Sequence, residues 1–423
     1  MADSAESPTA QVEASRPATV LGVPSFRFLL GSITTSALGA SVTTIAVTWL
    51  VYHATGSTID VAFVGLAELV PGIVFGLFAG VLADRYNRRL LMLASDISRA
   101  IIVAGLAAAL YLIGFSLAIV LVVMILIYTF TALFNPASQA MLPRLVPTTQ
   151  LEDANGLLAA SGQLSSTVGA GIGGLLVASA GAAAGLGVNV VTYVLSATLV
   201  FQIAASFGKT RGGTTHETRS FRREFVEGFA YMRQNPAVLA VTLGFMAVNF
   251  FLILVPIFLV VYSATVIGHS AAAYGYLVAA LSMGAVVGAL IVGRIRARRF
   301  AGVIVGVSFM GLAGGVGLLL LSGSILLSIA GIFLFGFSIG LVNTVYYATM
   351  QAIVPNEILA RVLSIDSVGS NVAAPAGIVV GGVLASAYGI LFTYSIAGAG
   401  CLVIGLAMLA IPSVRSLHYG GSP

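Results

Sequence analysis

Charged residues are scarce in this sequence, at 8% of its 423 residues, whereas a soluble domain has about 25%. The chain has one cysteine, Cys401, so no disulfide can form within it. It has one lysine, Lys209, and no G-x-x-x-x-G-K-[ST] loop, which excludes ATP-driven transport through that motif. Its four histidines lack a cysteine or acid at ligand spacing: His53, His216, His269 and His418. The sequence therefore predicts no enzyme, no metal site and no cofactor.

Apolar runs dominate instead, since 59% of the residues are hydrophobic. A helix needs about 20 apolar residues to cross the hydrocarbon core of a membrane. Twelve runs meet this requirement: 27–51, 60–83, 90–113, 117–135, 155–180, 183–205, 237–262, 272–293, 301–322, 324–348, 362–386 and 390–411. We therefore predict an all-α integral membrane protein with twelve transmembrane helices.

Arginine and lysine alternate between the connections of these helices. The connections near His53, Gly114, Gly181, His269, Gly323 and Tyr388 contain none. The others contain Arg85, Arg88, Arg89, Arg144, Lys209, Arg211, Arg219, Arg222, Arg223, Arg294, Arg296, Arg298, Arg299 and Arg361. Because basic loops stay in the cytoplasm, we expect both termini to be cytoplasmic and the chain to lie in the cytoplasmic membrane. The same bias explains the net charge of +5 without nucleic acid as a partner.

One long polar segment divides the chain into two halves of six helices. We predict a disordered tail over 1–25, a first half over 26–205, a linker over 206–235, a second half over 236–412 and a cytoplasmic tail over 413–423. Within the linker, Phe221, Phe225 and Phe229 recur at helical spacing, which indicates an amphipathic helix on the lipid surface.

The two halves repeat each other, since Asn135 and Asn343 are 208 positions apart and other residues match at that offset. The matching glycines, which we expect to pack helices closely, are Gly169, Gly173 and Gly174 in one half and Gly377, Gly381 and Gly382 in the other. Because each half has an even number of spans, the repeat keeps its orientation in the membrane. Such parallel repeats are typical of transporters that bind substrate between their halves.

The connection after the second span reads Gly80-Val-Leu-Ala-Asp84-Arg85-Tyr-Asn-Arg88-Arg89. It resembles the G-x-x-x-D-R-x-x-R-R loop of the major facilitator superfamily. The resemblance implies the twelve-helix fold of that family and a loop that holds the halves together on the cytoplasmic side. The second-half copy keeps Gly288 and its arginines but lacks the acid.

Two further segments resemble exporters within the superfamily. Gly169-Ala-Gly-Ile-Gly-Gly174 is similar to the G-P-x-x-G-G element of antiporters, with Ala170 in place of the proline. Small residues at this spacing also pack helices in any membrane protein. The stretches from Asn135 to Pro147 and from Asp96 to Ala100 resemble the subfamily of enterobactin and macrolide exporters.

Four ionisable residues lie within predicted spans, where charge is costly and often functional: Glu68, Asp96, Arg99 and Asp366. Glu68 has no basic residue near it in sequence, so it is a candidate proton carrier, with a structural acid or a substrate contact as the alternative. Asp96 and Arg99 are three positions apart and can form a pair, which is structural or helps conformational change. The family fold implies that Asp366 joins the cytoplasmic gate by binding Arg85 or Arg88; otherwise it is a solvated acid.

The resemblance implies that spans one, four, seven and ten line the central path. Candidate cavity residues on these spans and their neighbours carry amides, hydroxyls and aromatic rings: Ser36, Thr44, Asn135, Gln163, Asn249, Asn343, Tyr346, Tyr347 and Asn371. Such a lining suits an amphipathic or apolar small molecule.

We therefore expect a monomeric secondary transporter that works by alternating access and exports an amphipathic compound, such as a drug, siderophore or lipid-like metabolite, coupled to protons. One alternative is an uptake or facilitative carrier for a sugar-like or organic-acid solute. An alternative of another class is a membrane sensor or scaffold that transports nothing.

Overall fold

The computed structural model describes residues 19–204, 207, 221–268, 270–292, 300–321 and 323–417, and every regular element within them is helical. Residues 206 and 208–220 of the predicted linker, the tail before residue 19 and the last six residues lie outside this part of the chain. The second-half basic loop, with Arg294, Arg296, Arg298 and Arg299, lies outside it too.

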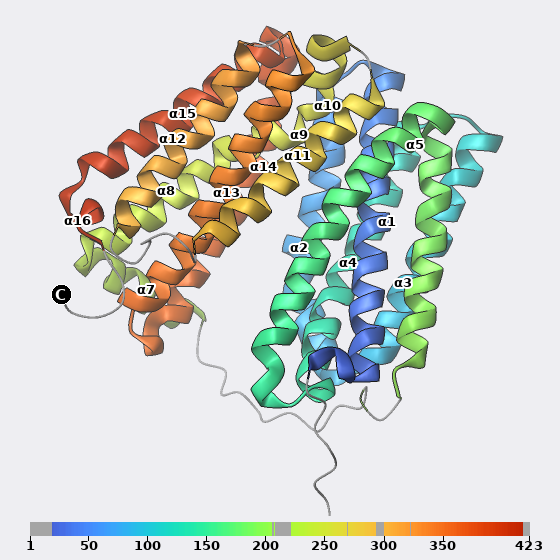
Figure 1. The fold of residues 1–423 in the computed structure, drawn as a ribbon, viewed down its shortest axis with the longest axis horizontal. Helices are drawn as coiled ribbons and strands as arrows, with labels where there is room; N and C mark the ends of the chain where they lie inside the picture. The colour runs from blue at the N-terminus through green and yellow to red at the C-terminus, as the bar shows by residue number, and fades with distance from the viewer. Residues whose placement is uncertain are drawn as a thin grey trace, which may run out of the picture.

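The first half consists of α1 (Pro24–Thr55), α2 (Thr58–Arg85), α3 (Arg88–Leu112), α4 (Leu117–Leu145) and α5 (Leu151–Gln202), with short 3₁₀ turns at Val20–Gly22 and Thr148–Gln150. The second half consists of α8 (Pro236–Leu252), α9 (Leu254–Ile257), α10 (Leu259–Tyr262), α11 (Ala271–Ile291), α12 (Ala301–Leu320), α13 (Ile325–Ile353), α14 (Asn356–Tyr388), α15 (Ile390–Ala410) and α16 (Pro412–Arg415). Helix α7 (Phe221–Gln234) precedes α8. Figure 1 shows the helices gathered into two bundles.

Helix α5 contains two spans, because the chain reverses at Gly181. This glycine has φ 80° and ψ 172°, a conformation that a side chain would strain. Within the described ranges, eleven helical segments are long and apolar enough to cross a membrane, and the 55-residue one includes this reversal. The predicted twelve-helix fold is thereby confirmed.

Two spans differ in shape from the prediction. Helix α4 does not end at residue 135 but continues through Pro136 and Pro143 to Leu145. The seventh span is not one helix but α8, α9 and α10, followed by a π turn at Ser263–Gly268. Pro256 lies in the interrupted part, and proline breaks a helix because it has no N–H to donate to the preceding turn.

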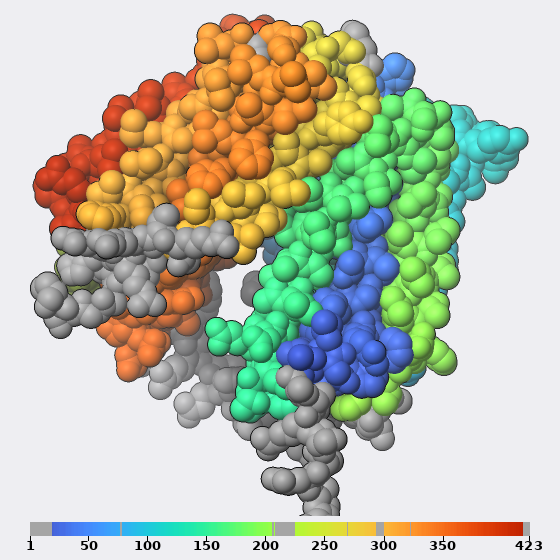
Figure 2. Space-filling view, in the orientation of Figure 1, coloured from blue at the N-terminus to red at the C-terminus, as the bar shows by residue number. Residues whose placement is uncertain are grey.

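The two bundles meet at one end and diverge at the other. They converge at the top of Figure 1 and separate toward the end that holds the start of α1, α7 and α16. Figure 2 shows a hollow between the bundles at that lower end. The helices that join the halves are α5 with α11 and α2 with α14, and the Thr58 hydroxyl donates to the Gly382 carbonyl, 3.2 Å away, across the second junction.

The repeated glycines occupy equivalent places in the two halves. A Cβ added to Gly169 would lie 2.7 Å from the Leu38 carbonyl oxygen of α1, and one added to Gly377 would lie 2.5 Å from the Phe250 carbonyl oxygen of α8. The last glycine of each set instead faces the opposite half: Gly174 lies against Gly275 of α11, and Gly382 against Ala62 of α2. The predicted packing role therefore includes the junctions between halves.

The glycines near the end of α2 and of α11 differ in their packing. A Cβ added to Gly76 or Gly80 would meet nothing within 4 Å, although Gly284 and Gly288, 208 positions later in the sequence, lie directly against the backbone of α13.

Helix α7 forms at the place predicted for the amphipathic helix. Its Glu227 carboxylate lies 2.6 Å from the Arg361 guanidinium of α14, and its Tyr231 hydroxyl donates to the Ile353 carbonyl of α13. Phe225 and Phe229 are exposed. An exposed apolar face on a helix that is tied to the bundle suits the membrane surface.

The glycine junction between α5 and α11 can be tested with two alanine substitutions on one helix. Gly174→Ala places a methyl group 2.6 Å from the Gly275 Cα, so the backbone must shift. We expect a loss of about 1–3 kcal/mol in the free energy of unfolding and a lower melting temperature of the purified protein. Gly171→Ala is the control, since its methyl group meets only the Ala279 Cβ at 3.9 Å. Equal melting temperatures for the two variants would contradict the close junction.

Candidate transport site and gates

The predicted site residues do not form one cluster. They fall into a group around Glu68 in the first half, a group around Asp366 in the second half, a buried ion pair, and the basic loop that follows α2. Each group is built from several helices.

The Glu68 carboxyl of α2 faces the hydroxyls of Thr44 on α1 and Tyr128 on α4. Those two hydroxyls lie 3.0 Å apart and share a hydrogen bond, while the buried Oε1 of Glu68 has no hydrogen-bond partner among the described residues. From the opposite half, Tyr274 of α11 interacts with Thr48 and with Glu68. The carboxyl therefore lies where the two halves meet, without a cation beside it.

Two of these partners, Tyr128 and Tyr274, are absent from the predicted site. Each lies within a long apolar run, where a tyrosine is indistinguishable from ordinary core. Thr44 and Thr48 are one helical turn apart on α1, so their spacing places both hydroxyls on one face. In the sequence, only this spacing indicates that Thr44 and Thr48 take part in one polar group around Glu68.

Asp366 lies inside the second half, and only 3% of it is exposed. Its carboxyl faces the Tyr346 hydroxyl of α13, which in turn faces the Thr242 hydroxyl of α8. Asp366 Oδ1, Tyr346 Oη and Thr242 Oγ1 are buried, and each lies close enough to the next to interact with it, although no hydrogen bond of standard geometry joins these atoms to described residues.

Asp366 does not bind Arg85 or Arg88 in this conformation, in which the halves diverge at the end that carries the basic loop. Its place in a closed gate stays a prediction. Asp366 is not a solvated acid, because it is buried.

Aromatic rings cover this carboxyl. The Tyr346 ring stacks on Phe245 with centroids 4.1 Å apart, and Tyr347 meets both rings edge-on. Tyr347 also interacts with Asp366 and is 44% exposed. Tyr347 therefore interacts with the buried acid and is itself partly exposed at the protein surface.

The pair of Asp96 and Arg99 is fully enclosed, with exposures of 0% and 2%. Arg99 donates to Asp96 Oδ1 and to the Thr131 hydroxyl of α4, and the Ser196 hydroxyl of α5 donates to Asp96 Oδ2 at 2.7 Å. The rings of Phe134 and Tyr193 lie 4.7 and 4.5 Å from the guanidinium carbon. The pair thus has all its main interactions satisfied and joins α3, α4 and α5.

In the basic loop after α2, Arg88 and Arg89 are held by hydrogen bonds to backbone carbonyls, whereas Asp84 is exposed. Arg88 donates to the Ala140 carbonyl of α4 at 2.9 Å, and Arg89 donates to the Val200 and Phe201 carbonyls at the end of α5. Cations at a helix C-terminus are favourable, because the last carbonyls lack helical donors. The Asp84 side chain is 76% exposed, and its Oδ1 comes no closer than 3.9 Å to a guanidinium nitrogen of Arg88.

The remaining cavity candidates differ in exposure. Asn135, Asn343 and Asn371 are exposed, Gln163 and Asn249 are partly buried, and Ser36 is buried between helices. Ser36 therefore does not present its hydroxyl to open space in this conformation. Asn249 donates to the Ser370 hydroxyl of α14 at 3.3 Å, so part of its amide is occupied by a helix contact.

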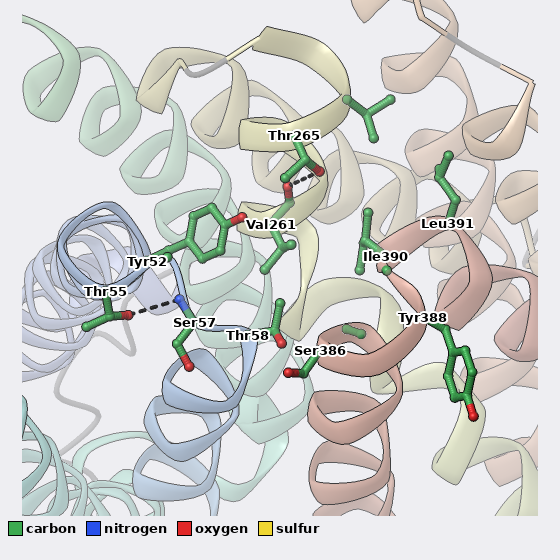
Figure 3. A pocket seen from close by; sticks show the side chains of 14 residues that line it. Tyr52, Thr55, Ser57, Thr58, Val261, Thr265, Ser386, Tyr388, Ile390 and Leu391 are labelled. Carbon is green, nitrogen blue, oxygen red and sulfur yellow. Dashed lines mark hydrogen bonds between the residues drawn. The ribbon is translucent and has the colours of Figure 1, made fainter.

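A separate pocket of about 680 Å³ lies at the end where the bundles converge. Figure 3 shows Tyr52, Ser57 and Thr58 of the first half facing Thr265 and Ser386 of the second half across it. None of the predicted cavity residues lines this pocket. It is a vestibule on the closed side rather than the predicted substrate site.

The sequence matches the transmembrane secretion effector family over residues 17–418. It is 26% identical over 410 residues to the multidrug efflux pump Tap of Mycolicibacterium fortuitum, covering 93% of this chain and 97% of that protein. Macrolide efflux protein A of Streptococcus pyogenes is 23% identical over 402 residues, covering 90% and 94%.

Solved structures of transporters share the fold. The nucleoside transporter NupG has a TM-score of 0.68 at 13% identity, over 92% of this chain and 98% of that chain. A bacterial homologue of the human lysosomal transporter Spinster, in an inward-facing and unoccupied conformation, has a TM-score of 0.69 at 14% identity, over 94% and 99%.

The buried ion pair generates a stability prediction. Arg99→Met leaves the Asp96 carboxylate enclosed without its cation, and we expect a loss of about 3–5 kcal/mol in the free energy of unfolding. Combining Arg99→Met with Asp96→Asn removes both charges, so the double variant should melt above the single variant. Melting temperatures of the purified proteins test this. A double variant less stable than Arg99→Met alone would contradict a structural pair.

Proposed function

Because the chain belongs to the transmembrane secretion effector family of major facilitator transporters, we propose that it exports amphipathic small molecules in exchange for protons. The observation that carries this proposal is the partly buried Glu68 carboxyl, whose Oε1 is enclosed and which has hydroxyl neighbours from both halves and no cation beside it among the described residues. The names of the relatives, a multidrug efflux pump and a macrolide efflux protein, support export.

The end that carries the termini and the basic loops is the cytoplasmic end in this proposal, since Arg-rich loops resist translocation. The hollow in Figure 2 opens toward that end. The conformation is then inward-facing, and a substrate enters from the cytoplasm or from the inner leaflet of the cytoplasmic membrane.

Glu68 is the proposed proton carrier. Protonation turns the carboxyl from an acceptor of hydrogen bonds into a donor, which changes its interaction with Thr44, Tyr128 and Tyr274. Tyr274 belongs to α11, the helix that meets α5 at the junction between halves. A change of charge at Glu68 therefore alters a contact between the halves. Alternating access requires this contact to rearrange when the protein turns to face outward.

The proposed substrate site lies between the halves and presents amides and aromatic rings. Asn135, Asn343, Asn371 and Tyr347 are exposed, and Gln163 is partly so. These groups offer hydrogen bonds and apolar faces without fixed charge, which suits amphipathic compounds.

The cytoplasmic gate is the proposed role of the loop from Gly80 to Arg89. Arg88 and Arg89 fix the loop to α4 and α5, while exposed Asp84 and the uncovered Gly80 leave the end of α2 ready to receive the second half. When the halves close at this end, the Asp84 carboxylate loses its contact with water and binds residues of the second half instead.

The rival functions predict different fluxes. A facilitative carrier would move its solute without moving protons. A sensor or scaffold would bind a compound without moving it.

Glu68→Gln tests the coupling. We expect ethidium, a macrolide or a siderophore to drive proton movement across liposomes that contain the wild-type protein and an internal pH dye. In Glu68→Gln this flux should fall at least about tenfold, because the amide cannot carry a proton. Glu357→Gln is the control, since Glu357 is an exposed acid at the start of α14.

Transport of compounds with no proton flux in the wild type would exclude exchange with protons and favour a facilitator. Binding without any flux would favour a sensor. Equal proton flux in Glu68→Gln and the wild type would assign coupling to another group.

The gate is tested by spin labels at the equivalent exposed positions Thr149 and Glu357, which are 208 residues apart. The native Cys401 is buried, so it should not react with the label. We expect the labelled wild-type protein to sample a short and a long distance. Asp84→Asn should deplete the short distance, because the closed gate loses its carboxylate. Asp153→Asn is the control, as an exposed acid in the first turn of α5. An unchanged distribution in Asp84→Asn would exclude Asp84 from the gate.

A further inference from the structure

Three acids within the described helices differ in what surrounds their carboxyls: Asp96 and Asp366 are buried, and Glu68 is partly buried. Asp96 has an arginine on one oxygen and a serine hydroxyl on the other. Glu68 and Asp366 have no cation, and each has a buried oxygen without a hydrogen-bond partner in the described chain. A buried group that is permanently charged needs a partner, and a buried structural acid is normally bonded. Glu68 and Asp366 therefore share the features of groups that gain and lose a proton.

We propose that Asp366, with Tyr346 and Thr242, is a second proton-binding site of the transport cycle, in the half opposite Glu68. The proposal rests on the proposed exchange of protons for substrate and adds a second site to it. The proton would come from water, add to a carboxylate oxygen of Asp366, and return to water later in the cycle.

The size of the site selects a proton over a substrate. Asp366 is 3% exposed, and Tyr346 and Thr242 are completely buried. An organic molecule in contact with this carboxyl would have to displace buried side chains. A proton needs only a path of hydrogen bonds, and the half-exposed Tyr347 interacts with Asp366.

The hydrogen-bonding groups at this site can respond to protonation. The hydroxyls of Tyr346 and Thr242 can each donate one hydrogen bond, and they follow Asp366 in a line without a hydrogen bond of standard geometry between them. In a carboxylate form, a small shift of α8 or α14 would let Tyr346 donate to Asp366 and Thr242 donate to Tyr346. In a protonated form, the acid itself becomes the donor. The two protonation states therefore favour different positions of three helices.

The other titratable groups near α14 are already engaged or distant. On the packed helices they are Tyr346 and Tyr347 of α13, Glu227 and Tyr231 of α7, and Tyr394 and Cys401 of α15. Glu227 binds Arg361, and Tyr394 donates to the Val255 carbonyl. Helix α2 approaches α14 at Ala62 and Gly382, toward the opposite end of the helix. Asp366 is thus the acid at this position whose charge is uncompensated.

Infrared titration of the purified protein tests the site with protons as the only ligand. Isotope-labelled aspartate shifts the carbonyl band of protonated aspartate and leaves that of glutamate in place. We expect two bands from buried carboxyls to change between about pH 5 and pH 9, one moved by the label and one not. Asp366→Asn should remove the labelled band, and Glu68→Gln the other. Asp96→Asn should leave both unchanged. A labelled band that stays constant with pH, or that survives Asp366→Asn, would overturn the proposal.

The spin-label pair at Thr149 and Glu357 gives a second readout. In the wild type, the pH dependence of the short-distance population should correspond to about two protons, and in Asp366→Asn to about one. Asp366→Glu should restore the second proton. An unchanged slope in Asp366→Asn would overturn the coupling role.

These outcomes are separate from those of the proposed function. If Asp366 titrates but no substrate drives proton flux, the second proton-binding site stands and the exchange mechanism is excluded. If substrate drives proton flux but Asp366 does not titrate, the exchange mechanism stands and the second site is excluded.

Discussion

The structure depends on one constraint, which is that polar groups inside a membrane must find their partners within the protein. Most do so here. Serine and threonine hydroxyls donate to carbonyls one turn earlier in their own helices, as Thr35 does to Gly31, and Arg99 is enclosed by Asp96, Thr131 and two aromatic rings. Against this background the few unpaired buried atoms stand out. Among the described residues, four of these atoms belong to Glu68 and to the group of Asp366, Tyr346 and Thr242, around two acids that have no cation beside them.

The same constraint explains the shape of the molecule. Helices can meet without side chains between them where glycine faces glycine, as at Gly174 and Gly275. Such a junction contains few polar contacts to break, so it can act as a pivot while the distant ends of the bundles move apart. Arg88 and Arg89 of the basic loop bind carbonyls of α4 and α5, which holds the helices of the first half together at this end.

The sequence was sufficient for the spans and the repeat, because length and hydropathy determine which segments enter a membrane. It did not indicate that α4 continues past Asn135 or that Pro256 divides the seventh span, since both depend on contacts outside the local pattern. The acids were found because charge is rare in such segments. Their neighbours were not, because a buried tyrosine such as Tyr274 has the same sequence signature as apolar filling. The burial of Asp366 was not predicted, because the depth of a side chain within the bundle depends on helix rotation rather than on residue order.

The two acids are placed differently, and the difference bears on mechanism. Glu68 contacts a residue of the opposite half, so its charge acts directly on the junction between halves. Asp366 contacts α8 and α13 of its own half, so its charge acts on the packing within that half. A rigid-body exchange between two conformations needs only the first kind of contact. The presence of the second kind implies that the second half also changes internally, at the interrupted seventh span, where α8 is already separated from α9 and α10. Because the seventh span is broken, its α8 segment, which carries Thr242, can move while α10 keeps its place at the end where the two bundles meet.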